Sequence, residues 1–436
     1  MSIRLLSSRW IVLGLLAFAG VGNSLNYVGE WFTGGDIVVT GSLSIQNAVW
    51  LALLVVSLVA FLPSLIREVL IGERWSKVYG LFLLYSAVMI LPASNQANAV
   101  RDFLQLAFPW LMYLLASRMI RTEPSGARSI IRAFWLGAVA TGALTVVMAL
   151  AGRSLFGTDY NGAIRFWGPM GWAGLGYYLL PYAFIAFAAI LYRLSTARIA
   201  IFLAVMLPFL ASLGRLSIAA CVMGFVICFM FWRGNARNKL IFAFIGTAGA
   251  VSSAVLVAPY LIHRMFGDGG KMLLSGRDTA SNYILSRLDM GIFQVLFGNG
   301  TGTARSITEE LIGISAEIRS RYFVTFIDSG IFGSALLAAS LALLMWSAIR
   351  ELRILGRNAW VWRDGENSSI APIQLAMAKV GCAIGMILIF AFDNLAFVYI
   401  LSMYFVALAG CYWMIEAAKR ESKAPPSRSA APSAEG

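Results

Sequence analysis

Apolar runs of about 18 to 25 residues recur along this chain, and they constrain its fold more than any other feature. A run of this length spans the roughly 30 Å hydrocarbon core of a bilayer as an α-helix. Only 13% of the 436 residues are charged, against about 25% in a soluble domain, so too little polar surface is available to face water. The runs lack the polar–apolar alternation of barrel strands. We therefore expect an all-α polytopic membrane protein.

We predict about twelve transmembrane helices, arranged in one transmembrane domain over residues 1–418. The first apolar run is interpreted as a span rather than a cleavable signal peptide. Residues 419–436 are rich in Pro, Ser and Ala, and we expect them to form a disordered cytoplasmic tail. The predicted spans are residues 10–26, 46–63, 78–93, 102–118, 131–151, 171–192, 197–213, 215–232, 240–261, 322–348, 372–392 and 395–415.

Lysine and arginine residues are distributed unequally between the two sides of these spans. One set of loops, which includes residues 118–132 and 350–363, carries about twice as many Lys and Arg residues as the other set. Because positive residues are retained on the cytoplasmic side, we expect this set and both termini to be cytoplasmic. The long loop 262–321 then lies outside the cytoplasm. This orientation also accounts for the net charge of +13, so no nucleic-acid partner is expected.

The loop 262–321 has the sequence features of an ordered segment. Its central stretch carries an apolar stripe close to helical spacing, and Ser306 followed by Glu309 forms a capping-box pattern in which Ser306 is the N-cap. We therefore expect two short amphipathic helices in this loop. Between them, the sequence "GNGTG" (298–302) has two readings: a simple turn, or a nest of backbone N–H groups that binds an anion.

The sequence offers little for metal chemistry and few charges within the spans. His263 is the only histidine, and the four cysteines lie inside apolar runs, where small buried hydrophobic side chains are expected. We expect no metal and no cofactor. Lys379 lies within a predicted span, and Asp393 lies at its end. An intramembrane charge indicates a functional site, although Lys379 could instead extend its ammonium to the interface.

Several arginines lie on the side facing away from the cytoplasm, against the positive-inside trend. Arg215 occupies a tight break between two predicted spans, Arg165 lies in the preceding external loop, and Arg277 lies beside Asp278. The planar guanidinium matches phosphate oxygens in a bidentate manner, so converging arginines would suit a diphosphate. The alternative is that an arginine near a span end extends to the interface. The long loop also contains Arg287, Arg305, Arg319 and Arg321.

Three stretches resemble a known family. "SLGRLSIAACVMG" resembles its arginine-containing start of a span, and "SGRDTASNYILSRL" followed by "LFGNGTGTA" resembles its Gly-Arg segment and glycine turn. "SRYFVTFIDSGIFGSALLAASLALLMW" resembles its entry into the next span, with Asp328 at the acidic position. The family is the O-antigen ligase/polymerase family, which includes the Wzy-type polymerases. The resemblance covers residues 205–348.

This resemblance implies a membrane glycosyltransferase in the bacterial inner membrane, with loop 262–321 in the periplasm. It would polymerise undecaprenyl-diphosphate-linked oligosaccharide repeat units into O-antigen, exopolysaccharide or capsule. Its partners would be the lipid-linked donor and acceptor glycans, the bilayer, a flippase and a chain-length regulator. Family ligases carry a histidine where this chain has Arg319, which favours a polymerase. The alternatives are an O-antigen ligase or O-oligosaccharyltransferase of the same family, and a lipid-linked glycan flippase or other transporter.

The resemblance also suggests roles for individual residues. Arg215 and Arg277 match the family's arginines that hold the diphosphate, and Arg319 would contact a phosphate or a sugar. Asp278 and Glu317 are the candidate catalytic carboxylates that would orient or deprotonate the acceptor hydroxyl. Apart from the resemblance, the candidate sugar-binding residues are Tyr160, Arg165, Trp167 and Tyr322, although an aromatic belt at the membrane interface would explain Tyr160 and Trp167 equally well.

Overall fold

The fold is taken from a computed structural model. It describes residues 55, 63, 65–122, 126–152, 155–158, 164–166, 171–192, 195–212, 215–231, 240, 286–287, 291–312, 320–357, 370–392 and 398–421. The predicted spans 10–26, 46–63 and 240–261 lie almost entirely outside this part of the chain, as does the tail 422–436.

The described part of the chain is almost entirely helical, and a helix overlaps each predicted span that falls within it. A short antiparallel hairpin of β1 (Phe156–Thr158) and β2 (Ile164–Phe166) precedes α6. The helices are α3 (Arg74–Val88), α4 (Gln96–Thr122), α5 (Gly126–Leu150), α6 (Gly171–Tyr192), α7 (Thr196–Ala211), α8 (Arg215–Phe231), α11 (Ile292–Phe297), α12 (Thr303–Ile312), α13 (Arg321–Arg357), α14 (Ile370–Phe392) and α15 (Val398–Glu421).

Several of these helices have the length and composition of membrane spans. Among the described residues, the segments Gln96–Arg121, Arg321–Leu355 and Ile373–Ala391 are long and apolar enough to cross a bilayer. Shorter apolar helices accompany them, including Leu175–Leu191 and Leu216–Phe231. These helices are consistent with a membrane protein.

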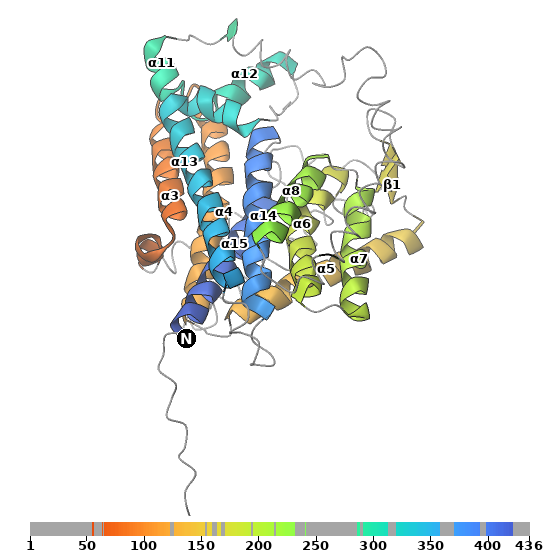
Figure 1. Ribbon diagram of the computed structural model, residues 1–436. Helices are drawn as coiled ribbons and strands as arrows, with labels where there is room; N and C mark the ends of the chain where they lie inside the picture. The colour runs from red at the N-terminus through yellow and green to blue at the C-terminus, as the bar shows by residue number, and fades with distance from the viewer. Residues whose placement is uncertain are drawn as a thin grey trace, which may run out of the picture.

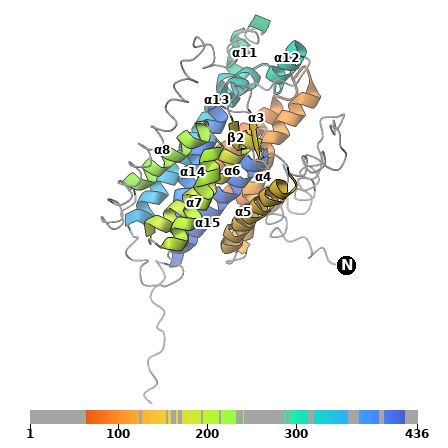
Figure 2. The same ribbon diagram turned by 90° about the vertical axis from the view of Figure 1, so that its right-hand side faces the viewer.

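The helices form a bundle in which α14 and α15 lie between two groups. Helices α3, α4 and α13 lie on one side and α6, α7 and α8 on the other, while α11 and α12 cover one end (Figure 1). The view turned by 90° again places α11 and α12 at that end (Figure 2). The main packing partners are α15 with α4, α13 with α3 and α14, and α14 with α6, α8 and α15.

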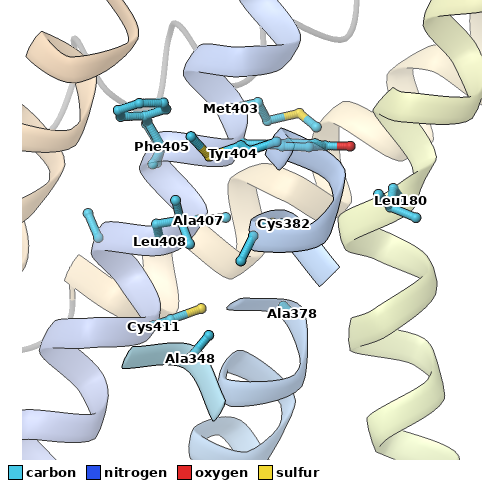
Figure 3. Packing of buried hydrophobic residues seen from close by; sticks show 14 of the residues in the cluster. Leu180, Ala348, Ala378, Cys382, Met403, Tyr404, Phe405, Ala407, Leu408 and Cys411 are labelled. Atoms are coloured by element: carbon cyan, nitrogen blue, oxygen red, sulfur yellow. The ribbon is translucent and has the colours of Figure 1, made fainter. Parts of the chain in front are cut away.

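The centre of the bundle depends on close helix packing around α14. Gly385 of α14 lies so close to α6 and α15 that an added Cβ would be 2.8 Å from both Leu180 and Tyr404. The Tyr404 hydroxyl donates to the Tyr177 carbonyl oxygen at 2.7 Å, which satisfies its polar atom in the apolar core. Figure 3 shows Tyr404 and Leu180 among the buried residues of this core. All four cysteines are free and buried, as expected from their place in apolar runs.

Antiparallel packing assigns each helix terminus to one end of the bundle. Ser340 of α13 donates to the Trp75 carbonyl of α3 at 3.1 Å, and the Tyr85 hydroxyl near the end of α3 donates to the Phe297 carbonyl of α11 at 2.7 Å. The start of α13 and the end of α3 therefore share the end covered by α12, which we call the α12 end. An added Cβ on Gly176 would meet Ser217, so α6 and α8 also begin there.

The described basic residues separate according to these ends. Arg101, Arg215, Arg305 and Arg321 lie at the α12 end, because Arg101 is near the start of α4, Arg215 and Arg321 begin α8 and α13, and Arg305 lies on α12. The described helix ends that flank the loops predicted to be cytoplasmic lie at the opposite end. Their basic residues are Arg67, Arg74, Lys77, Arg118, Arg121, Arg128, Arg132, Arg198, Arg350, Arg353, Arg357, Lys419 and Arg420.

Candidate functional site

The glycine loop 298–302 packs against a kink in α13. Gly330 has non-helical angles (φ 63°, ψ −165°), which interrupt the regular hydrogen bonding of the helix. The carbonyl oxygens of Ile327 and Asp328 instead accept from the backbone N–H groups of Asn299 at 2.9 Å and Gly300 at 3.0 Å. The kink thus leaves two helix carbonyl groups free to accept hydrogen bonds from the backbone of the loop.

Glycine is required at the contact between the loop and the kink. Gly298, Gly300 and Gly302 have φ of 92°, 101° and 81°, a region that side chains other than glycine rarely adopt. An added Cβ on Gly330 would stand 2.6 Å from the Gly298 nitrogen, which leaves no room for a side chain. On its other side the loop is held by Thr301, whose N–H donates to the Met89 carbonyl after α3 at 2.8 Å.

The Asp328 carboxylate binds the backbone where the glycine loop ends and α12 begins. Its Oδ2 accepts from the Gly302 N–H at 2.9 Å, and its Oδ1 accepts from the Ala304 N–H at 3.0 Å. Ala304 is the second residue of α12, so Asp328 caps this helix from another segment of the chain. Of the two readings of "GNGTG", the structure favours the turn: the N–H groups of Asn299, Gly300 and Thr301 donate to backbone carbonyls, and only the Gly302 N–H donates to a carboxylate.

The predicted capping box at Ser306 is wrong. Helix α12 begins at Thr303, and Ser306 lies inside it, with its N–H donating to the Gly302 carbonyl at 3.0 Å. A capping box is a local pattern, whereas the cap here comes from a residue far along the chain. The local sequence therefore placed the helix start four residues too late.

Asp102 of α4 lies between two arginines at the same end of the bundle. Arg305 Nε of α12 lies 3.0 Å from Asp102 Oδ1, and Arg321 Nη1 of α13 lies 3.8 Å from Asp102 Oδ2. The first contact is an ion pair without hydrogen-bond alignment, because Oδ1 has no hydrogen-bond partner in the described structure. The side chains of Asp102 and Arg321 are only 2% and 4% exposed. Asp102 and Arg321 also interact electrostatically with Asp328.

Beside the acceptor Asp102 Oδ1, three donor atoms of this cluster have no hydrogen-bond partner in the described part of the chain. They are Arg305 Nη1, Arg321 Nε and Thr325 Oγ1, and all three are buried. A buried donor without a partner costs about 1–3 kcal/mol, so such atoms favour an incoming acceptor. Guanidinium donors suit the oxygens of a phosphate, and a buried setting strengthens that attraction. The cluster of Asp102, Arg305, Arg321, Thr325 and Asp328 is our candidate site.

The cluster holds charge but contains no free general base. Both Asp328 oxygens accept from backbone N–H groups, and Asp102 is shared by two arginines. Each carboxylate is thus already engaged by cations or donors of the protein itself. The arrangement can therefore bind and stabilise an anionic group, while a base would have to come from elsewhere in the chain.

The structure describes three of the residues that the sequence proposed for the site. Arg215 is the first residue of α8 at the α12 end. Tyr322 follows Arg321 on α13 and is partly buried against the main core. Arg165 lies on β2 opposite Gly157. Outside the described residues lie Tyr160, Trp167, Arg277, Asp278, Glu317 and Arg319.

Sequence reasoning did not single out Asp102 or Thr325, and it gave Arg305 and Arg321 no role of their own. One signal was available, because Arg321, Thr325 and Asp328 recur at helical spacing and thus share a face of α13. Asp102 carried no comparable signal, since only the fold brings this residue of α4 to Arg305 of α12 and Arg321 of α13.

A second buried charge cluster lies toward the opposite end of the bundle. The Lys379 ammonium of α14 donates to Glu73 Oε1 at 2.5 Å, Glu351 Oε2 at 2.9 Å and Ser347 Oγ at 3.1 Å. Its side chain is 0% exposed, so the idea that it extends to the interface is wrong. Glu73 also accepts from Trp75 Nε1 at 2.8 Å. The cluster ties α14 to α13 and to the start of α3.

Comparison with known proteins adds no relative, because no family model and no curated protein matches the chain. Within the described residues, no group of three or more His, Cys, Asp or Glu side chains is placed to hold a metal ion.

Proposed function

We propose that the chain is a membrane-embedded glycosyltransferase that polymerises undecaprenyl-diphosphate-linked oligosaccharide repeat units at the periplasmic face of a bacterial inner membrane. The observation that carries the proposal is the pair of buried arginines, Arg305 and Arg321, whose unpartnered donor atoms suit a diphosphate. They lie beside two of the stretches that carry the family resemblance, the glycine loop and the start of α13.

The proposed topology has about twelve spans, with both termini in the cytoplasm and loop 262–321 in the periplasm. Its support is the separation of the described basic residues: those in the predicted cytoplasmic loops share the end opposite α12. In this orientation the candidate site faces the periplasm, where lipid-linked repeat units are assembled by the family that the chain resembles.

The proposed reaction is a displacement at the anomeric carbon of the donor glycan. An acceptor sugar hydroxyl forms the new glycosidic bond, the bond to the diphosphate breaks, and undecaprenyl diphosphate leaves with the bonding electrons. Arg305 and Arg321 would neutralise the negative charge that grows on the diphosphate, together with Arg215, Arg277 and Arg319. The hydroxyl proton would pass to a carboxylate supplied by Asp278 or Glu317, because the carboxylates of the described cluster are occupied.

The sugar rings would be held by the remaining proposed contacts. Tyr322 lies next to Arg321 on α13, so a donor bound by this arginine would bring its first sugars near the tyrosine ring. Tyr160, Arg165 and Trp167 would contribute from the loop that contains the β-hairpin. A flippase and a chain-length regulator are the protein partners of this proposal.

A transporter or flippase of lipid-linked glycans is the second candidate, and one observation favours it. Transporters place charged groups within the membrane, and Lys379 is fully buried between Glu73 and Glu351. A ligase or O-oligosaccharyltransferase remains the related alternative within the resembled family. Arg319 at the ligase histidine position makes the polymerase the better proposal.

The test is the surface polysaccharide of a strain that lacks this chain, separated on a gel. A polymerase deletion leaves a single repeat unit attached to its acceptor, and this is the expected result. Long chains retained on the lipid carrier would identify a ligase, and loss of all repeat units from the outer face would identify a flippase. Unchanged polymer would overturn all three functions.

A further inference from the structure

We propose that Asp328 is a positioning residue, which holds the start of α12 so that Arg305 is fixed against Asp102. The part of this inference that concerns the reaction rests on the proposed function. The mechanical part, that the Asp328 carboxylate holds α12, does not.

The geometry ties both carboxylate oxygens to the segment that carries Arg305. Oδ2 accepts from Gly302 N–H and Oδ1 from Ala304 N–H, so the carboxylate bridges the loop and the first turn of α12. Arg305 follows Ala304 directly in the chain. Because two bonds at one carboxylate fix direction as well as distance, α12 cannot turn about its axis without breaking one of them.

The described hydrogen bond from α4 to α12 is longer than the two bonds of this bridge. Asn98 Nδ2 of α4 donates to Ser306 Oγ at 3.4 Å, which is long for a hydrogen bond. A small apolar cluster of Ala304, Val324 and Ile327, with Ile307 packed against it, adds area without directional bonds. The bonds of Asp328 and the Arg305–Asp102 ion pair are therefore the charged contacts that orient the helix.

The same geometry excludes two other roles: phosphate binding by the glycine loop and general-base catalysis by Asp328. The N–H groups of Asn299, Gly300 and Thr301 donate to backbone carbonyls and that of Gly302 to Asp328, so the glycine loop is not available to bind the phosphate of a substrate. With both oxygens engaged, Asp328 is not a base. Asp328 would affect the reaction by setting the position of the Arg305 guanidinium. A displacement of about 1 Å in a group that positions the substrate can lower the rate roughly a hundred-fold.

The kinetic test is a double-mutant cycle in the purified full-length protein with an undecaprenyl-diphosphate-linked repeat unit as substrate. Asp328→Asn keeps the size but removes one acceptor and the charge, and it should lower kcat/KM for the donor about ten-fold or more. Combined with Arg305→Ala it should add little further loss, because both changes remove the same interaction. Additive losses would overturn the positioning role. Glu416→Gln, at the opposite end of the bundle, is the matched control for loss of a carboxylate.

The structural test does not depend on activity. Ile307 is partly buried against the apolar cluster, so a cysteine that replaces it should be partly shielded from a maleimide. The four native cysteines are buried and should react slowly. Asp328→Asn should accelerate maleimide labelling of this cysteine at least several-fold, with a smaller effect from Asp328→Glu, which keeps the charge. Unchanged labelling in both variants would overturn the holding of α12. An inactive wild-type protein would count against the proposed function alone, since the labelling would still decide whether Asp328 holds the helix.

Discussion

The Lys379 ammonium of α14 lies 2.5 Å from the Glu73 carboxylate at the start of α3, although 306 residues separate them in sequence. Both side chains are almost fully buried. A buried ion pair gains little net stability over apolar residues, but removal of one partner leaves an uncompensated charge. The pair therefore makes the position of the start of α3 relative to α14 dependent on both residues.

Replacement of Lys379 by Met should destabilise the protein by about 3–5 kcal/mol, because Glu73 and Glu351 would lose their shared cation in the core. The measurement is the unfolding temperature of the detergent-purified protein. Lys77→Met, at an exposed position of α3, is the matched control and should have little effect. Equal melting temperatures for Lys379→Met and wild type would show that the pair does not hold these helices together.

Gly330→Ala should destabilise the docking of the glycine loop. Its φ of 63° costs a non-glycine residue about 1–3 kcal/mol, and the added Cβ would meet the Leu296 carbonyl oxygen at 2.5 Å. We expect a lower unfolding temperature and lower yield of folded protein. Gly142→Ala in α5 is the control, because nothing lies within 4 Å of its Cβ and alanine favours a helix. If the two variants melt alike, the kink does not require glycine.

Arg321→Ala should reduce polymer formation at least a hundred-fold, by analogy with the loss of about 3–4 kcal/mol on removal of one oxyanion donor. Arg321→Lys keeps the charge but loses the planar fork, so it should be tolerated only in part. Polymer length on gels, normalised to protein in membranes, measures both. Arg74→Ala, exposed at the opposite end, serves as the control. Normal polymer from Arg321→Ala at normal expression would remove this arginine from the proposed site.

The proposed orientation predicts which positions an impermeant maleimide can reach in intact spheroplasts. A cysteine replacing Thr308 on α12 should label, while one replacing Arg74 at the opposite end should label only after lysis. The buried native cysteines keep the background low. The reverse pattern would invert the topology and move the candidate site to the cytoplasmic face.

The helical fold followed from the sequence because span length and hydrophobicity are local properties. Each predicted span within the described residues overlaps a helix, since an apolar run must satisfy its backbone groups within itself. The positions of Arg305 and Arg321 near the same end also followed, because they flank one short connection before α13.

The partners of the buried charges were decided by the tertiary structure alone. Lys379 could not be matched to Glu73 or Glu351, nor Asp102 to Arg305, because ion pairing depends on which helices become neighbours. The same holds for Asp328, whose acidic character was visible but whose role as the cap of α12 was not. Local sequence sets the hydrophobic pattern of each helix. A buried charge, in contrast, is stabilised only by a partner charge or hydrogen bond, and here the tertiary fold brings that partner from a distant segment of the chain.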